Sequence, residues 1–376
     1  HHLTRELLCQ THSATIRTQR LLDATRAGCF HASLLRMSES SAPEPAFRIG
    51  SIPVYGRLIL SPMDGISDPP FRWITRRLGS ALSISEFINT LDYANQKHYQ
   101  VSRLSFRAAE RPFGVQLLDN DPFRMADCAA EIYSEYQPDF FDVNLGCCTA
   151  SVTSRGAGAG MLRTPAKVAQ AFQELSKAVP VPLTAKLRLG WDEDSLNYRQ
   201  IAEIAVENGA CVIALHGRTA KMAYTGKARW QPIAELKASL PVPVIGNGDV
   251  TSPTRAHQIF AQTGCDAAMV GRAAKANPFI FSWRDRSEVS PEEIYGLIRY
   301  QLEAMQAFHP AGALLPFRKF LKAYLEPYAL PKEQLRALLT SGEEAELLRL
   351  IDQVFPAQGV MDLAGAEQDF RNRMHE

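Results

Sequence analysis

Short runs of apolar residues alternate with longer amphipathic stretches along most of the chain, beginning near residue 57. Each run is four to six residues long and starts roughly 20 to 40 residues after the one before it. Apolar runs of this length, bounded by turn residues, are typical of strands that are buried on both faces. We therefore predict eight strands. They are Arg57–Ser61, Ala81–Glu86, Phe113–Leu117, Phe140–Asn144, Leu183–Leu187, Cys211–Leu215, Val242–Gly246 and Ala267–Val270.

The stretches between these runs have the apolar spacing of helices that cover a sheet. Examples are Asp121–Tyr136, Pro165–Val179, Ser195–Asn208 and Ser252–Thr263. Apolar strands that alternate with helices favour parallel βα units. Eight units predict an α/β fold, the (β/α)8 TIM barrel, over residues 47–283. A doubly wound open sheet is the structural alternative, but it normally carries a glycine-rich phosphate motif after its first strand, and this chain lacks one.

The two ends of the chain differ from this repeating pattern. Residues 284–376 have helical periodicity and predict a C-terminal helical domain, with 11 basic and 15 acidic residues and so a net charge of −4. Residues 1–46 are interpreted as an N-terminal extension. Residues 1–36 hold five arginines, four histidines and two acidic residues, and the first methionine is Met37. We expect this segment to be poorly ordered or non-native, with an organelle transit peptide as the alternative.

The composition is that of an ordinary globular protein, with 46% hydrophobic and 22% charged residues and a formal net charge of +1. It excludes a disordered or coiled-coil chain, and no apolar run is long enough to predict a transmembrane helix. The seven cysteines are odd in number and form no C-x-x-C pair. They indicate reduced thiols in a cytoplasmic protein rather than a disulfide framework or a metal site.

Unusual polar residues follow the predicted strands, where a barrel of this kind carries its catalytic groups. A lysine within an apolar strand is informative, because an unpaired buried ammonium costs several kcal/mol and calls for an anionic or electron-rich partner. The features that share this barrel face are Ser61-Pro-Met-Asp-Gly65, Gln116, Asn144-Leu-Gly-Cys-Cys148, Lys186, Arg188, His216-Gly-Arg218, Gly246-Asn-Gly-Asp249 and Gly271-Arg272.

The glycine turns after the seventh and eighth predicted strands indicate a phosphate site. Gly246–Asp249 and Gly271-Arg272 present backbone amides that no side chain obstructs, and a helix begins soon after the first turn, at Ser252-Pro253. Turns in these two places form the usual phosphate site of this barrel, and Arg272 can bind a phosphate through two hydrogen bonds. A ligand with a terminal phosphate, such as a mononucleotide cofactor, fits this pattern.

Taken in order, these motifs resemble the tRNA-dihydrouridine synthase family, and within it the bacterial B-type enzymes most. The resemblance covers about residues 50 to 330. The motifs that carry it are Ser61-Pro-Met-Asp-Gly-Ile-Ser-Asp68, Asn144-Leu-Gly-Cys147, Arg155-Gly-Ala-Gly158, Lys186-Leu-Arg-Leu-Gly-Trp191, His216-Gly-Arg-Thr219, Tyr224-Thr-Gly-Lys227, Gly246-Asn-Gly-Asp249, Gly271-Arg272 and Asn277-Pro278.

The resemblance implies an FMN cofactor at the barrel mouth, reduced by NADPH. It implies that Gln116 and Lys186 bond the polar edge of the flavin ring and that His216 lies beside the ring. Three residues would lie against the isoalloxazine, namely Pro62, Met63 and Asp64. Others would hold the ribityl chain and the phosphate, namely Asn247, Gly248, Asp249, Gly271 and Arg272.

The reaction implied by the resemblance is reduction of the 5,6 double bond of a uridine in the D-loop of tRNA. Hydride passes from flavin N5 to uracil C6, and Cys147 donates a proton to C5. Asn144 would hold the uracil edge, and Arg188 and Arg218 would contact the base or its phosphate. A stacked base cannot reach such a pocket, so the uridine must be flipped out of the RNA.

The helical domain of the family contacts tRNA through a helix matched here by Pro316–Tyr324. On this basis Arg318, Lys319 and Lys322 are candidate RNA contacts, and Tyr324 would add a stacking surface. We expect a monomer with no metal and no membrane association. The chain departs from the family pattern at Cys148 and Ser151, where proline and lysine are usual.

Two other classes of function stay open at this stage. One is a flavin-dependent TIM-barrel oxidoreductase that acts on a free pyrimidine or another small molecule. The basic helix and the C-terminal domain argue against it. The other is a non-catalytic RNA-binding protein on a retained barrel, against which Lys186, Cys147 and the phosphate-binding turns argue.

Overall fold

The computed structural model describes residues 44–355, except the side chains of residues 96–99. The predictions for residues 1–36 and for the last part of the helical domain therefore lie outside the described residues. The described range forms one compact unit.

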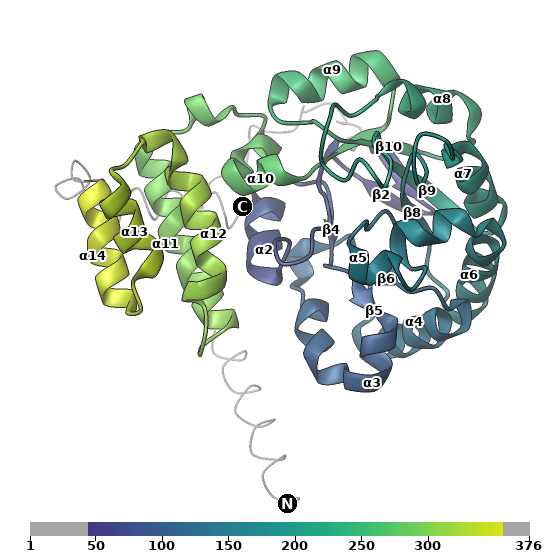
Figure 1. The fold of residues 1–376 in the computed structure, drawn as a ribbon, viewed down its shortest axis with the longest axis horizontal. Coiled ribbons are helices and arrows are strands. Elements are labelled where there is room, and N and C mark those ends of the chain that lie inside the picture. The colour runs from purple at the N-terminus through teal and green to yellow at the C-terminus, as the bar shows by residue number, and fades with distance from the viewer. Residues whose placement is uncertain (1–43, 356–376) are drawn as a thin grey trace, which may run out of the picture. The chain divides into compact units, whose positions relative to one another are not determined.

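A parallel β-barrel forms the centre of this unit (Figure 1). Its strands follow one another in the order β3-β11-β10-β9-β8-β7-β6-β4, and β5 also pairs with β6. The backbone N–H of Ala81, just before β4, donates to the carbonyl of Leu58 in β3 at 2.8 Å, which links the two ends of this order. The strands are β3 (Leu58–Leu60), β4 (Ser83–Ile84), β5 (Ile88–Asn89), β6 (Phe113–Leu118), β7 (Phe140–Leu145), β8 (Leu183–Arg188), β9 (Ala210–His216), β10 (Val244–Asn247) and β11 (Ala267–Val270).

The predicted TIM barrel is thus confirmed, and the open sheet is excluded. Strands β6 and β7 are buried at every position, which explains why they appear in the sequence as continuous apolar runs instead of alternating ones. Within the second predicted strand, Ala81–Glu86, only β4 forms, and β5 follows beyond the predicted bounds.

Helices surround the barrel, as the amphipathic stretches predicted (Figure 1). The first turns of α2, α4 and α9 combine an N-cap side chain with proline: Asp121, for example, accepts from two backbone N–H groups of α4, and Ser252 accepts from one of α9. Helix α7 begins at Tyr198 and not at the predicted Ser195, because Leu196 forms an antiparallel bridge with Gly190. These helices are α2 (Pro69–Arg77), α3 (Thr90–Gln100), α4 (Pro122–Tyr136), α5 (Ala150–Thr153), α6 (Pro165–Ala178), α7 (Tyr198–Glu207), α8 (Gln231–Ser239), α9 (Pro253–Thr263) and α10 (Arg272–Ala276).

A short hairpin, which the sequence pattern did not predict, closes one end of the barrel. It consists of β1 (Phe47–Ile49) and β2 (Ile52–Val54), paired antiparallel. Its apolar side chains share a core cluster with Ile59 and Ala267, which lie near the start of their strands. The opposite, carboxyl end of the barrel is therefore the end available for a ligand.

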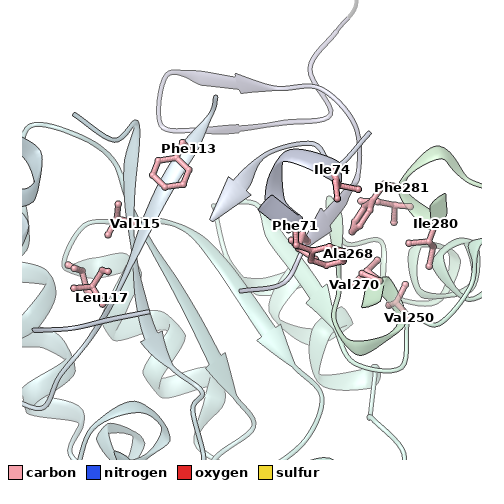
Figure 2. Close-up of a cluster of buried hydrophobic side chains, with 14 of the residues drawn as sticks. Phe71, Ile74, Phe113, Val115, Leu117, Val250, Ala268, Val270, Ile280 and Phe281 are labelled. Carbon is pink, nitrogen blue, oxygen red and sulfur yellow. The ribbon is translucent and has the colours of Figure 1, made fainter. Parts of the chain in front are cut away.

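Four further helices pack on the barrel through a shared core. Figure 2 shows Phe71 and Ile74 of α2 near Ala268 and Phe281, and the same cluster includes Phe320 of the C-terminal helices. The rings of Phe71 and Phe320 are 4.8 Å apart. These helices are α11 (Pro291–Phe308), α12 (Leu314–Leu325), α13 (Lys332–Thr340) and α14 (Glu344–Val354).

The predicted boundary between residues 283 and 284 remains a prediction, because the barrel and the four helices share this core. Tyr324 of α12 is fully buried, so the expected stacking surface for RNA does not exist. Tyr324 lies on the apolar face of the amphipathic helix α12, and this face packs into the hydrophobic core. Within residues 44–355, no helix is long and apolar enough to cross a membrane.

Candidate active site

A cavity of about 420 Å³ opens at the carboxyl ends of the barrel strands. It lies on the face where the sequence predicted the chemistry, and it brings together residues from six of the strand ends. The predicted residues that line it are Pro62, Met63, Asp64, Asn144, Cys147, Lys186, Arg188, His216, Arg218, Asn247, Gly248, Asp249, Gly271 and Arg272.

Lys186 of β8 is one of the cations that line this cavity. Its Nζ donates to Oδ1 of Asn247 at 3.3 Å, and Nδ2 of Asn247 donates to the carbonyl of Met269 at 2.9 Å. Burial, with a smaller contribution from nearby Arg188, lowers the pKa of Lys186 to about 8. The ammonium is therefore mostly charged at pH 7, and it has donors to offer an electron-rich ligand atom.

His216 ends β9 as a neutral imidazole. Burial and the surrounding cations, Lys186 first among them, hold its pKa well below the usual range. Nη1 of Arg218 lies 3.2 Å from Nε2 of His216. Because a guanidinium can only donate, Nε2 is the acceptor and the proton of the neutral ring is on Nδ1. A neutral His216 can thus donate from Nδ1.

Gly248 leaves the space beside His216 open. Its φ of +114° is in the region that favours glycine. A Cβ at this position would lie 2.6 Å from Cβ of Ala228 and 2.9 Å from Cδ2 of His216. The glycine predicted for close approach to a ligand is therefore also required by the fold.

Arg188 and Arg218, predicted to contact substrate, are both buried and both hold loops. Arg188 donates to the carbonyl of Gly146 at 2.8 Å and to two carbonyls of the loop after β9. Arg218 donates to Oδ1 of Asp249 at 2.6 Å and to carbonyls of that same loop. Their contact with substrate stays a prediction, since both line the cavity.

Two residues of the predicted phosphate site differ in their surroundings: Asp249 is hydrogen-bonded within the protein, whereas Arg272 is exposed. The carboxylate of Asp249 accepts from Arg218 and from the backbone N–H of Ala228 at 2.7 Å, so it braces the turn after β10. Arg272 is exposed, and its guanidinium lies 4.8 Å from the ring centroid of Tyr224. The cation available to an anionic group is thus Arg272.

Tyr224 belongs to the motif Tyr224-Thr-Gly-Lys227, but the sequence analysis assigned it no role in the site. Its ring is 56% exposed and lines the cavity between Arg272 and Arg188, whose guanidinium lies 5.5 Å from the ring centroid. An aromatic ring next to two cations is stabilised by cation–π attraction while it offers a face to a ligand. The signal that could have found it is its place in a glycine-containing loop after a strand end.

Cys147 lies in the loop after β7 and lines the cavity. Its Sγ lies 3.3 Å from Oγ1 of Thr149, a cavity residue that sequence reasoning missed. Cys148 does not line the cavity and packs against the main hydrophobic core. Of the two adjacent thiols, the cavity therefore receives that of Cys147.

Asn144 and Gln116 have partners that the sequence did not predict. Oδ1 of Asn144 accepts from the backbone N–H groups of Gly146 and Cys147, at 3.0 and 2.8 Å. Gln116 is buried behind Asn144, does not line the cavity, and also bonds Asp142. The contact of Gln116 with a flavin ring stays a prediction.

The wall formed by Ser61–Asp68 is held from two sides. The N–H of Gly65 donates to Glu86, which follows β4, and the carbonyl of Gly65 accepts from Nζ of Lys319 in α12. Burial raises the pKa of Glu86. It also raises the pKa of Asp68 to about 6. The sequence missed Glu86, although it ends a predicted strand where functional residues were expected.

The three basic residues predicted to contact RNA differ in their surroundings. Arg318 donates to the carbonyl of Ser341 at 2.8 Å, and Lys319 is engaged by Gly65. Lys322 is exposed. None of the three lines the cavity, so a contact with RNA would lie outside it. Across the described part of the chain, no cluster of side chains suited to a metal ion was found.

The comparisons with known proteins agree with the geometry. The family model described as dihydrouridine synthase matches residues 59–356. Three similar proteins are named tRNA-dihydrouridine synthase B. That of Pseudomonas aeruginosa is 38% identical, over 62% of this chain and 70% of the relative. That of Xanthomonas axonopodis pv. citri is 35% identical, over 75% and 87%. That of Escherichia coli is 34% identical, over 82% and 98%.

A solved complex of 2-naphthoyl-CoA reductase with 2-naphthoyl-CoA is similar in fold alone. Its TM-score is 0.50 at 11% identity, and the match covers 74% of this chain and 57% of that one. The family assignment therefore rests on the family model and on the curated relatives. Because the model matches most of the chain and these relatives are at least 34% identical over most of their length, the chain belongs to the dihydrouridine synthase family.

Proposed function

We propose that this protein is a tRNA-dihydrouridine synthase that binds FMN in the cavity at the barrel mouth and uses NADPH as its reductant. The observation that carries the proposal is the meeting of three groups in one cavity. These are the ammonium of Lys186, the thiol of Cys147 and the exposed guanidinium of Arg272. Each suits a different part of the reaction, and the family membership supports reading them together.

The residues present fit a flavin mononucleotide. Met63, Val250 and Met269 give the cavity apolar surface for a flat ring system, Lys186 offers donors within it, and Arg272 offers a cation for a phosphate. Gly248 keeps the intervening space open. When bound, the flavin would supply the hydride that uracil accepts at C6.

Two residues of the protein would stabilise the charge on the flavin ring and supply the proton to uracil. Lys186 would stabilise negative charge at the edge of a bound flavin ring, and Sγ of Cys147 would donate its proton to C5 of uracil as general acid. The thiolate that remains is reprotonated from solvent. The net reaction consumes one uridine, one NADPH and one proton, and yields one dihydrouridine and one NADP⁺.

The macromolecular substrate is proposed from the relatives' names. A uridine in the D-loop would be flipped into the cavity, at a cost that phosphate contacts must offset. Lys322 is the exposed cation of α12 that is suited to such a contact, whereas Arg318 and Lys319 would first have to release their carbonyl partners. We infer that the protein acts as a cytoplasmic monomer, with residues 284–376 as its RNA-contacting part.

The decisive experiment incubates the purified protein with FMN, NADPH and tRNA that lacks dihydrouridine. Nucleoside mass spectrometry should detect dihydrouridine at one mapped position, and free uridine given to the same protein should remain unchanged. Absence of product with tRNA would overturn the proposal. Reduction of free uridine at an equal rate would instead favour an oxidoreductase of small molecules.

A further inference from the structure

A chain of side-chain hydrogen bonds runs behind the loop that carries Cys147. Nε2 of Gln116 donates to Oδ2 of Asp142 at 2.7 Å, and Nδ2 of Asn144 donates to Oε1 of Gln116 at 2.7 Å. Oδ1 of Asn144 accepts from the backbone N–H of Cys147 at 2.8 Å. Asp142, Gln116 and Asn144 are 1%, 1% and 8% exposed, so water does not compete for these bonds.

The direction of this chain is determined at both ends. The N–H groups of Gly146 and Cys147 can only donate, so the atom of Asn144 that faces them is its oxygen. The amide nitrogen of Asn144 must then face Gln116, and the amide nitrogen of Gln116 must face Asp142. The carboxylate of Asp142 is the acceptor that ends the chain. Its other oxygen accepts from Oγ1 of Thr184 at 2.6 Å.

Without an acceptor at position 142, the NH₂ group of Gln116 would be buried without its partner, and only the bond from Asn144 would hold the amide of Gln116 in this orientation. A reversed Gln116 would present its nitrogen to Asn144, and Asn144 would turn its own nitrogen toward the two backbone N–H groups. Two sets of donors would then face each other in a buried place, which is strongly unfavourable. The loop would have to move away from its present position.

We propose that Asp142 and Gln116 are positioning residues that hold the amide of Asn144, and through it the loop carrying Cys147, in one orientation. The proposal deepens the proposed function, because it says how the acid is presented to the cavity. The geometry itself does not depend on that function. It gives Gln116 a role in the loop, and its contact with the cofactor stays a prediction.

The test measures hydrogen exchange of the amides of Gly146 and Cys147 by mass spectrometry in the full chain. Asp142→Leu removes the acceptor and should speed this exchange about tenfold or more, as expected when a buried amide loses its partner. Asp142→Asn should exchange as the wild type does, because its carbonyl can face Gln116 while its NH₂ faces the Thr184 hydroxyl, which can also accept. Thr184→Val is the matched control. It removes the other partner of Asp142, lies outside the chain of bonds, and should leave the exchange unchanged.

A reversal of the chain gives a sharper test, because its variants keep the side-chain volume and the double variant also keeps the net charge. Asn144→Asp places a carboxylate on each side of Gln116, whose one NH₂ group cannot serve both, and should speed the exchange. Adding Asp142→Asn should restore it, since Gln116 can then donate to the carboxylate at 144 and accept from the amide at 142. If these residues only filled space, and the direction of their hydrogen bonds did not matter, the second substitution would not restore the exchange rate.

Unchanged exchange in Asp142→Leu, or no rescue in the double variant, would overturn the proposal. The same holds if Asp142→Leu weakens FMN binding alone, because Gln116 would then serve the cofactor. A wild-type protein that makes no dihydrouridine would overturn the proposed function, but the exchange pattern would still decide the role of Asp142.

Discussion

At the scale of single residues, two neighbouring thiols have different surroundings. Cys147 lines the cavity with its Sγ 3.3 Å from Thr149, whereas Cys148 packs against the core. Of the two, only Cys147 lines the cavity. Which thiol is the acid can therefore be tested by substituting each in turn.

Cys147→Ala should slow reoxidation of the reduced flavin by tRNA about a hundredfold or more, because a positioned acid is lost. Reduction of the flavin by NADPH needs no acid and should proceed at the wild-type rate. Stopped-flow absorbance measures both steps, and Cys148→Ala serves as the control with little loss. Severe loss in Cys148→Ala would assign the acid to the other thiol.

The pKa of Lys186 predicts how flavin affinity depends on pH. Burial brings this pKa to about 8, so the ammonium is present below pH 8 and is lost as the pH rises above it. The affinity of the flavin-free protein for FMN should therefore fall between about pH 7 and 9. Flavin fluorescence titrations across this range measure the effect. Lys186→Arg should remove the pH dependence, because a guanidinium stays charged.

At the scale of elements, helix α2 begins at the cavity wall, and burial makes the ionised form of its N-cap residue, Asp68, unfavourable. Asp68 accepts from the N–H of Phe71 at 3.0 Å, but burial raises its pKa from 3.8 to about 6. A carboxyl group with a raised pKa destabilises the fold as the pH rises through the interval between the two values, and the loss is complete above the higher one.

Asp68→Asn keeps the cap and removes this cost. Relative to wild type, the variant should gain stability as the pH rises from about 4 to 6, by up to roughly 3 kcal/mol, since one pKa unit corresponds to about 1.4 kcal/mol. Urea unfolding of both proteins at pH 4, 5, 6 and 7 measures the difference. A difference that is constant with pH would mean that Asp68 has an ordinary pKa.

Helix α12 carries two lysines with different expected roles. Lys322 is exposed and Lys319 bonds the cavity wall at Gly65. Lys322→Met should weaken tRNA binding and lower its salt slope by about one unit, without effect on flavin retention. Lys319→Met should instead loosen the wall and weaken flavin retention. Filter binding at several salt concentrations, together with flavin titration, separates the two. Equal effects of both variants on each assay would contradict this division.

At the scale of the whole molecule, the barrel and helices α11–α14 share a hydrophobic core, in which Phe320 lies against Phe71. Phe320→Ala should destabilise the described unit by about 3 to 5 kcal/mol, as large-to-small core changes do. Leu315→Ala, on the same helix but at a 73% exposed position, is the control and should have little effect.

Unfolding of this unit should also be cooperative. Far-UV circular dichroism, which follows all helices, and flavin release, which follows the barrel, should give coincident transitions in wild type and in Phe320→Ala. Two separate transitions would instead support an independent helical domain beginning near residue 284.

The sequence by itself determined the strands of the barrel, the end of the barrel that carries the chemistry, and most of the cavity lining. It could do so because these features are local: a strand buried on both faces is a continuous apolar run, and its end is adjacent in the chain to the residues that follow it. Lys186 is therefore found from its position alone, whereas Cys147 was distinguished from Cys148 by the family resemblance.

Only the tertiary structure decided which of these polar groups are available to a ligand. Arg218 is engaged by Asp249, Lys319 by Gly65 and Gln116 by Asp142, in pairs separated by 31, 254 and 26 residues. Residue type and strand position do not specify such distant partners, and neither do they show that Tyr224 lies between two arginines. A side chain's role depends on how many of its donors and acceptors remain after folding, and that number is set by contacts between distant parts of the chain.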